Sequence, residues 1–454
     1  MQHAPQRNET RTAPRLTNGA RRARAGVVIA GLLLGACGSG VTTSTERPIV
    51  PTDSSVRIDE HHYLGVPFTV ENLTVWPVHT DDPLDVGEFL TLQEAQARGV
   101  ATVREIGGGA VRQIAATNRN FELREGNSEP GDNAGRAAVA DVTTDDTEEV
   151  ESVAQRHVSG SSSLLNNSGA QVNTLVIENR GSLPLLVCAG TIVKGGNQDR
   201  QIGQDIVVAA GATVPVDAFC VEQGRWTNVR EGIANGGEFV ALNAVASKGI
   251  RTKGQFLDDQ SGVWEEVAQA RVASLATAGR SADARGDQRA SQSMQSRSIQ
   301  ISGTTLVDSL DKADDDRQGV RTRHVDALRE HFHALLDGES APVGFAYAVN
   351  GQAEGVRVFA HDRLFRQNLE SFAMSLALEA EAAGGAQTER EPATADDVVA
   401  LVQAIEKDAV ERREETRASN FNVLLTNGAG FNGNCYYEAE DGKAVPVTRD
   451  WTRK

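Results

Sequence analysis

Four runs rich in β-branched residues follow one another in the middle of the chain, and they constrain the fold more than any other feature. Gly, Asn and Pro separate them, and they lie at residues 174–177, 183–193, 201–209 and 213–221. Short β-branched runs with turn residues between them are typical of antiparallel strands. The middle of the chain is therefore predicted to form an antiparallel sheet or sandwich.

Strand and helix signals before this region extend the β-rich half toward the N-terminus. Phe68–Val70 and Leu73–Val78 are β-rich runs. Thr91 and Glu94 form a capping-box pattern that opens a short helix, and Gly99 can close it. A further strand is expected from residue 101 to 106, so strand and helix alternate here.

The last third of the chain is predicted to be mostly helical. Helices are expected over Thr322–Leu336, Asp362–Ala383 and Thr394–Arg417, and the later two each have one apolar face at helical spacing. Between the first two, Asn350-Gly351 links two β-rich runs, which predicts a hairpin over residues 344–359. The fold class is thus α+β, with a β-rich front half and about three C-terminal helices.

Two compositionally biased segments interrupt a single predicted domain over residues 64–454. Residues 120–171 are rich in Asp, Glu, Ser, Gly and Ala and almost lack aromatic residues. Residues 274–323 are rich in Ala, Ser, Arg, Gln and Asp, although they open as a possible helical extension. Such segments bury too little apolar surface to offset their ordering entropy, so both are expected to be insertions of low order.

The first 36 residues have the pattern of a lipoprotein signal peptide. Six arginines and one acidic residue precede the apolar run Ala25–Leu34, which is too short to span a bilayer because a helix needs about 20 residues for that. Leu34-Gly-Ala-Cys37 is similar to a bacterial lipobox. Arg21-Arg22 lacks the rest of a twin-arginine signal. We expect acylated Cys37 to hold the protein in the membrane.

The residues after Cys37 refine this location. Residues 37–63 begin with a stretch rich in Thr, Ser and Pro and are expected to form a flexible tether. Gly38 follows the cysteine where an Asp would favour retention in the inner membrane. We therefore expect a cell-envelope protein, held in the outer membrane and facing the periplasm or the cell exterior.

Charge and cysteine content exclude several classes of function. The 45 Lys and Arg against 62 Asp and Glu give a formal charge of −17, which disfavours a nucleic-acid partner. None of the four cysteines lies in a C-x-x-C pair, which excludes a zinc ribbon and a thioredoxin-like motif. Outside the cytosol, Cys188, Cys220 and Cys435 allow three disulfide pairings, of which Cys188 with Cys220 is preferred.

Metal and cofactor motifs are weak in this sequence. His324, His331 and His333 cluster on a predicted helix without an H-E-x-x-H pattern, so a solvated histidine face is the favoured interpretation. A calcium-loop pattern beginning at Asp314 has Val325 where a bidentate Glu is needed. Nucleophile-elbow, P-loop and dinucleotide motifs are missing, and no metal or cofactor is expected.

Two glycine-bearing loops carry the densest chemical signal. The first contains Gly195-Gly196, Gln198 and Arg200, and the second contains Glu222, Arg225 and Trp226. Glycines let backbone N–H groups approach a ligand, and arginines bind carboxylates or phosphates in a bidentate manner. An anionic ligand could lie between the loops. The alternative is a hairpin turn at Gly195-Gly196 that ion pairs of Glu222 and Arg225 brace.

These motifs resemble the ARPP domain family, the ARG and Rhodanese-Phosphatase-superfamily-associated Protein domain. The resemblance covers most of residues 64–447 and rests on Asn72-Leu-Thr-Val-Trp76-Pro, Thr91-Leu-x-Glu-Ala95, Lys194-Gly-Gly-x-Gln198-Asp-Arg200, Val214-Pro-Val, Cys220-Val-Glu-Gln-Gly-Arg-Trp226 and Val263-Trp264. It implies a mixed α and β domain that is linked to ADP-ribose metabolism by association. It also makes Gln198, Arg200, Glu222 and Arg225 the best site candidates.

Two classes of function remain in view. In the first, the domain is a binding or interaction module in which Arg200 and Arg225 hold an anionic small molecule or an acidic segment of a partner. In the second, it is a hydrolase acting on a phosphate or ADP-ribosyl bond, with Glu222 as general base or metal ligand. A third reading is a rhodanese-type sulfurtransferase or phosphatase, because Cys220 and Arg225 have the spacing of such an anion cradle.

Overall fold

The computed structural model describes the chain from Val56 to Lys454 with several gaps. The described residues are 56–105, 174–223, 229–230, 233–234, 237–284, 306–311, 319–338, 340–384, 391–416, 418–438 and 443–454. The expected signal peptide, Cys37 and the insertion at 120–171 lie outside them, as do Arg225 and Trp226. None of the described helices is both long and apolar enough to cross a bilayer.

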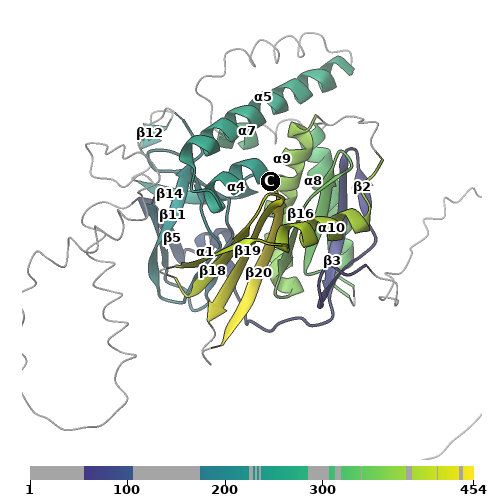
Figure 1. Cartoon of the computed structure of the whole chain (residues 1–454). Helices are drawn as coiled ribbons and strands as arrows, with labels where there is room; N and C mark the ends of the chain where they lie inside the picture. The colour runs from purple at the N-terminus through teal and green to yellow at the C-terminus, as the bar shows by residue number, and fades with distance from the viewer. Residues whose placement is uncertain are drawn as a thin grey trace, which may run out of the picture. The chain divides into compact units, whose positions relative to one another are not determined.

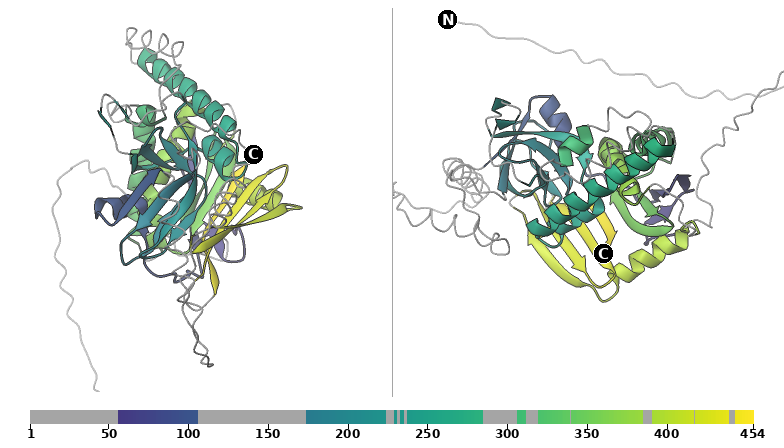
Figure 2. Two further views of the ribbon diagram at one scale, coloured as in Figure 1. Left: turned by 90° about the vertical axis from the view of Figure 1, so that its left-hand side faces the viewer. Right: turned by 90° about the horizontal axis from the view of Figure 1, so that it is seen from above.

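Six antiparallel strands from the front half close into a barrel (Figures 1 and 2). In barrel order these are β11 (Thr213–Cys220), β6 (Thr174–Asn179), β5 (Ala101–Glu105), β14 (Glu238–Val245), β8 (Thr191–Gly195) and β9 (Arg200–Ile202). Closure leaves no exposed sheet edge, and alternate side chains such as Leu175, Ile177 and Val193 form one buried cluster. The predicted antiparallel arrangement is confirmed, in the form of a barrel.

Smaller elements accompany the barrel. β4 (Leu90–Thr91), β7 (Leu185–Val187) and β10 (Ile206–Val208) form a three-stranded sheet, and β12 (Val229–Arg230) pairs with β13 (Ile233–Ala234). Helix α1 (Leu92–Ala97) has the predicted capping box of Thr91 and Glu94, and Gly99 follows it with φ +70°.

A nine-stranded antiparallel sheet combines strands from both ends of the described chain. Its order is β1 (His62–Leu64), β3 (Leu73–Thr80), β15 (Gly344–Val349), β16 (Gln352–Phe359), β20 (Ala444–Arg453), β19 (Gly430–Glu438), β18 (Asn420–Thr426) and β17 (Val410–Glu415), with β2 (Phe68–Val70) beside β3. The β15–β16 hairpin is the predicted one, and its turn residues Asn350 and Gly351 both have positive φ. Because β1 is part of the sheet and Ile58 is buried, the last residues of the predicted tether belong to the folded domain.

Helices cover both faces of this sheet. α8 (Val320–Leu336) and α9 (Asp362–Ala382) pack with β3 and β15 in one apolar cluster, and α10 (Ala395–Glu406) packs on the other face in a second cluster. The third helix, α10, is shorter than the predicted range Thr394–Arg417. It ends at Glu406, because the backbone of Lys407 is already extended, and Val410–Glu415 then pairs with β18.

Part of residues 274–323, which were predicted to be an insertion of low order, is helical in the structure. Helix α5 (Gln260–Ala284) continues through its first residues, and α7 (Leu306–Asp311) lies inside it. Leu306, Val307 and Leu310 of α7 are buried in a cluster with residues of α5 and of α4 (Lys248–Gln255). Three apolar residues on one turn and a half of helix anchor this segment despite its polar surroundings.

An aromatic cluster between α8, α9 and the sheet allows a test of this packing. Phe365 is fully buried and contacts the rings of Phe332, Phe345 and Phe359. Replacing it with alanine is expected to lower the free energy of unfolding by about 3–5 kcal/mol, because the cavity cannot collapse fully. Urea denaturation measures the change. The matched control is Val66→Ala, which is 68% exposed and is expected to leave stability nearly unchanged.

Candidate functional site

The loop between β8 and β9 adopts a conformation that only glycine allows. Gly195 has φ +148°, and a Cβ there would lie 2.1 Å from the backbone oxygen of Glu238. Gly196 has φ +49°, and a Cβ there would lie 2.1 Å from the ring of Phe239. These two glycines therefore let the loop pack directly against the start of β14.

Hydrogen bonds then tie this loop to the end of β11. The side chain of Gln198 donates to the backbone oxygen of Glu222 (2.9 Å), and the backbone N–H of Asp199 donates to the Glu222 carboxylate (3.1 Å). The Asp199 carboxylate accepts in turn from the backbone N–H of Gly195 (3.0 Å). The structure brings Gln198 and Glu222 together, and both of them brace the loop.

Arg200 lies at the same end of the barrel and is almost fully buried, with 2% of its surface exposed. Its Nη1 donates to the backbone oxygen of Gln198 (2.7 Å). Its Nη2 lies 3.9 Å from the carboxylate of Glu105, which already accepts two hydrogen bonds from Asn197. Nε of Arg200 has no hydrogen-bond partner. Among the residues that the structure describes, the carboxylate that pairs with this buried guanidinium is that of Glu105, at 3.9 Å.

Cys220 does not have the properties of a rhodanese-type nucleophile. Its side chain is buried, and burial raises the pKa of the thiol although the charge of Arg200 opposes this shift. A nucleophilic cysteine needs a lowered pKa, and Arg225 of the expected cradle lies outside the described residues. The geometry therefore disfavours the sulfurtransferase reading.

The predicted disulfide between Cys188 and Cys220 is not formed. The cysteines of the described residues, Cys188, Cys220 and Cys435, are all free and buried. Cys220 ends a barrel strand, whereas Cys188 lies in a different apolar cluster together with Cys435. Burial raises the pKa of the Cys188 thiol to about 12, which makes this thiol unreactive.

A buried ion pair links the barrel side of the molecule to the nine-stranded sheet. Asp205, in the turn between β9 and β10, accepts two hydrogen bonds from Nη2 of Arg357 on β16 (2.9 and 2.8 Å). Thr448 and the backbone N–H of Ala189 also donate to its carboxylate (2.5 and 2.7 Å). Burial alone would raise the pKa of Asp205, but Arg357 and these donors outweigh it and hold the pKa below its usual range.

A second ion pair continues the first along the sheet. Arg251 on α4 pairs with Asp450 on β20, and Nη1 of Arg357 lies 3.7 Å from the same carboxylate. Asn420 and Asn422 of β18 both donate to the backbone oxygen of Asp205 (3.0 and 3.1 Å). Two arginines and two aspartates thus form one electrically balanced buried network.

This network was missed in the sequence, although a signal for it exists. Polar residues occupy every second position on three adjacent strands: Asn420 and Asn422, Asn432 and Asn434, and Thr448, Asp450 and Thr452. Alternate residues of a strand share one face, so the pattern indicates a polar face on an otherwise buried sheet. The partners Asp205 and Arg251 come from other elements and carry no such pattern.

Of the three histidines predicted to form a solvated face on α8, His333 is exposed, whereas His324 and His331 are not. His324 is fully buried with its Nδ1 against the backbone oxygen of Val320 (2.6 Å), and His331 stacks on Phe68. Within the part of the chain that the structure describes, no three His, Cys, Asp or Glu side chains are grouped so that they could hold a metal ion.

Removing the carboxylate charge tests the buried network. Asp205→Asn leaves Arg357 buried without its main counter-charge and is expected to lower the free energy of unfolding by about 3–5 kcal/mol. Urea denaturation at neutral pH measures this. Glu370→Gln, which removes the solvent-exposed partner of Arg329, is the control and is expected to have little effect because water screens that pair.

The same variant has a defined pH dependence. Because folding lowers the pKa of Asp205, this residue stabilises the protein above its unfolded pKa of about 3.9, and the contribution is lost as pH falls toward the folded pKa. The gap in stability between the wild type and Asp205→Asn should therefore narrow below about pH 4. An unchanged gap down to pH 2 would contradict this account.

Comparison with known proteins agrees with the motifs of the barrel loops. The family model of the ARG and Rhodanese-Phosphatase-superfamily-associated Protein domain, ARPP-1, matches residues 148–441, which include Arg200, Asp205, Glu222 and Arg357. The motifs at residues 72–77 and 91–95 precede the matched range, so their likeness stays a prediction. No curated protein and no solved structure matches the chain. The matched range covers more than half of the chain, and the predicted resemblance is confirmed: the chain belongs to the ARPP-1 domain family.

Proposed function

We propose that this protein is a lipid-anchored cell-envelope protein whose ARPP-1 domain binds an anionic small molecule or an acidic segment of a partner. The binding site comprises the loop with Gly195, Gly196, Gln198 and Arg200, together with Glu222, Arg225 and Trp226 of the following loop. Anchoring rests on the lipobox that ends at Cys37, and ligand binding rests on the surroundings of Arg200.

The observation that carries the binding proposal is the incomplete compensation of Arg200. A buried guanidinium is costly unless it is paired and hydrogen-bonded. Here Nε has no hydrogen-bond partner, and Nη2 lies 3.9 Å from the carboxylate of Glu105, which already accepts hydrogen bonds from Asn197. A bound carboxylate or phosphate would supply the missing negative charge and acceptors.

Binding is favoured over hydrolysis because of how Glu222 is used. Its carboxylate accepts from the backbone of Asp199, and its backbone oxygen accepts from Gln198. These bonds give Glu222 a positioning role in the loop. A general base would instead need its carboxylate aimed at a substrate or a water molecule.

Ligand-induced stabilisation tests the binding site. The full-length chain with Cys37→Ser, which lacks the acylation site, is mixed with ADP-ribose, nucleotides or phosphosugars, and its melting temperature is recorded. We expect at least one of these anions to raise the melting temperature by several degrees, because it binds only the folded protein. The increase should disappear in the Arg200→Ala, Arg225→Ala double variant.

A second double variant controls for the loss of positive charge. Arg329→Ala with Arg363→Ala removes two solvent-exposed arginines and should keep the full ligand-induced increase. The proposal fails if no anion stabilises the unsubstituted chain, or if the Arg200 variant responds as strongly as this control. In either case the two loops serve only to brace the barrel.

Acylation of Cys37 is tested independently. In bacteria supplied with an alkyne-bearing fatty acid, the protein is expected to incorporate the label and to sediment with the membranes. Cys37→Ser should abolish both the label and the sedimentation, because the mature chain carries a net negative charge and anionic lipid repels it. Cys188→Ala, which removes a buried thiol, should retain the label. Membrane association of Cys37→Ser without the label would exclude acyl anchoring.

A further inference from the structure

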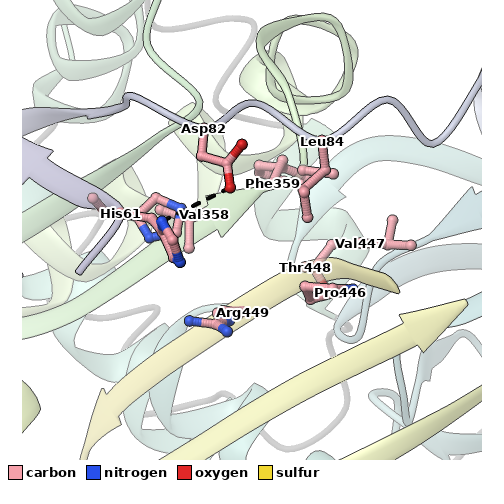
Figure 3. Close-up of a pocket in the computed structure, with 11 residues that line it drawn as sticks. His61, Asp82, Leu84, Val358, Phe359, Pro446, Val447, Thr448 and Arg449 are labelled. Atoms are coloured by element: carbon pink, nitrogen blue, oxygen red, sulfur yellow. Dashed lines mark ion pairs between the residues drawn. The ribbon is translucent and has the colours of Figure 1, made fainter. Parts of the chain in front are cut away.

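A pocket of about 200 Å³ opens where the ends of β1, β3, β16 and β20 meet, remote in sequence from the glycine loops. Its lining divides into two kinds of side chain. His61, His62, Asp82 and Arg449 provide polar groups, and Leu84, Phe359, Pro446 and Val447 provide apolar surface. Figure 3 shows His61, Asp82 and Arg449 gathered on one side and Leu84, Val447 and Pro446 on the other.

Arg449 is the strongest polar group of this pocket. Its side chain is 30% exposed, and Nη1 lies 3.3 Å from the carboxylate of Asp59. Nε is buried and has no hydrogen-bond partner. Asp59 also accepts hydrogen bonds from His62, whose Nδ1 lies 2.9 Å from both Asp59 oxygens. The backbone N–H groups of His61 and His62 donate to the same carboxylate. Arg449 is therefore only partly neutralised by a carboxylate that several other donors share.

His62 also lines the pocket, where its ring binds Asp59. Because Nδ1 donates to Asp59, Nε2 of the neutral ring is an acceptor and does not bind an anion. Asp82 contributes little against an anion, since its side chain is 63% exposed and lies 3.8 Å from Nδ1 of His61. Water solvates a carboxylate at that position, so the charge deeper in the pocket is that of Arg449.

The apolar side of the pocket is built on the rigid core of the protein. The guanidinium of Arg357 lies over the ring of Phe359, 5.4 Å from the ring centroid. Thr448 donates a hydrogen bond to the carboxylate of Asp205. The backbone N–H of Leu84 donates to the backbone oxygen of Ala360 (3.0 Å), which holds Leu84 in place. Walls that are held in this way keep the pocket open without a ligand and lower the cost of binding.

We propose that this pocket is a second ligand site, which binds a small molecule with one carboxylate or phosphate group and a short apolar chain. Arg449 holds the anionic group, and Leu84, Phe359 and Val447 enclose the chain. The volume lies below the range of about 300–1,000 Å³ that drug-sized ligands occupy, which limits the chain to a few carbon atoms.

Calorimetric titration tests this site with three ligands of the same chain length. Hexanoate, hexyl phosphate and the neutral hexanamide are titrated into the full-length chain carrying Cys37→Ser. We expect at least one of the two anions to bind and hexanamide to bind at least about tenfold more weakly, because it lacks the charge that Arg449 recognises. The anion that binds more tightly identifies the headgroup.

Three variants locate the binding. Arg449→Gln should weaken anion binding about tenfold, while Asp59 keeps its bonds to His62 and so preserves the local fold. Leu84→Trp fills the apolar side and should abolish binding without changing any charge. The double variant Arg200→Ala, Arg225→Ala should bind normally, which separates this site from the glycine-loop site.

Several results would overturn the proposal. These are no heat of binding for either anion at millimolar concentration, equal affinity for hexanamide and hexanoate, and unchanged affinity in both Arg449→Gln and Leu84→Trp. Circular dichroism of each variant verifies that it is folded, so that a lost affinity reports on the pocket.

Discussion

The buried pair of Asp205 and Arg357 is the interaction on which the rest of the structure depends. It joins a turn of the barrel segment to a central strand of the nine-stranded sheet, and both side chains are almost inaccessible to water. Taking two charges out of water costs several kcal/mol per ion, so the pair is tolerable only because other donors complete it. Thr448, Ala189, Asn420 and Asn422 provide these hydrogen bonds. Such a pair specifies one alignment of barrel and sheet, since any shift would leave charges unpaired.

Both proposed ligand sites are related to this network. The glycine loop leads into β9, and Asp205 lies three residues beyond the end of that strand. The pocket near Arg449 is lined by Thr448, which belongs to the network. It is also lined by Phe359, and the guanidinium of Arg357 lies over that ring. The two sites differ in their charge balance. Arg200 is buried with one distant carboxylate, whereas Arg449 is partly exposed and shares Asp59 with a histidine. A buried cation and a partly exposed cation are expected to bind different ligands.

Local sequence signals predicted most of the individual elements. The capping box at Thr91, the turn at Asn350-Gly351 and the apolar face of α9 all depend on residues within a few positions of each other. The predictions were wrong where contacts between residues far apart in the sequence determine the structure. The helix predicted to Arg417 stops at Glu406 because β18 offers strand pairing to the residues that follow. Helix α7 is ordered because Leu306 and Val307 are buried against residues brought there by other helices.

The sequence by itself determined the α+β class, the antiparallel front half, the turn at Gly195-Gly196 and the family. Each of these is encoded in residues that lie close together in the chain, where backbone geometry and hydrophobic periodicity act directly. Only the tertiary structure decided that the barrel closes, that Cys188 and Cys220 remain free, and that Asp205 meets Arg357 across 152 positions of sequence. The reason is physical: ion pairs, pockets and barrel closure depend on distances between elements, and those distances are set by how whole apolar faces pack together.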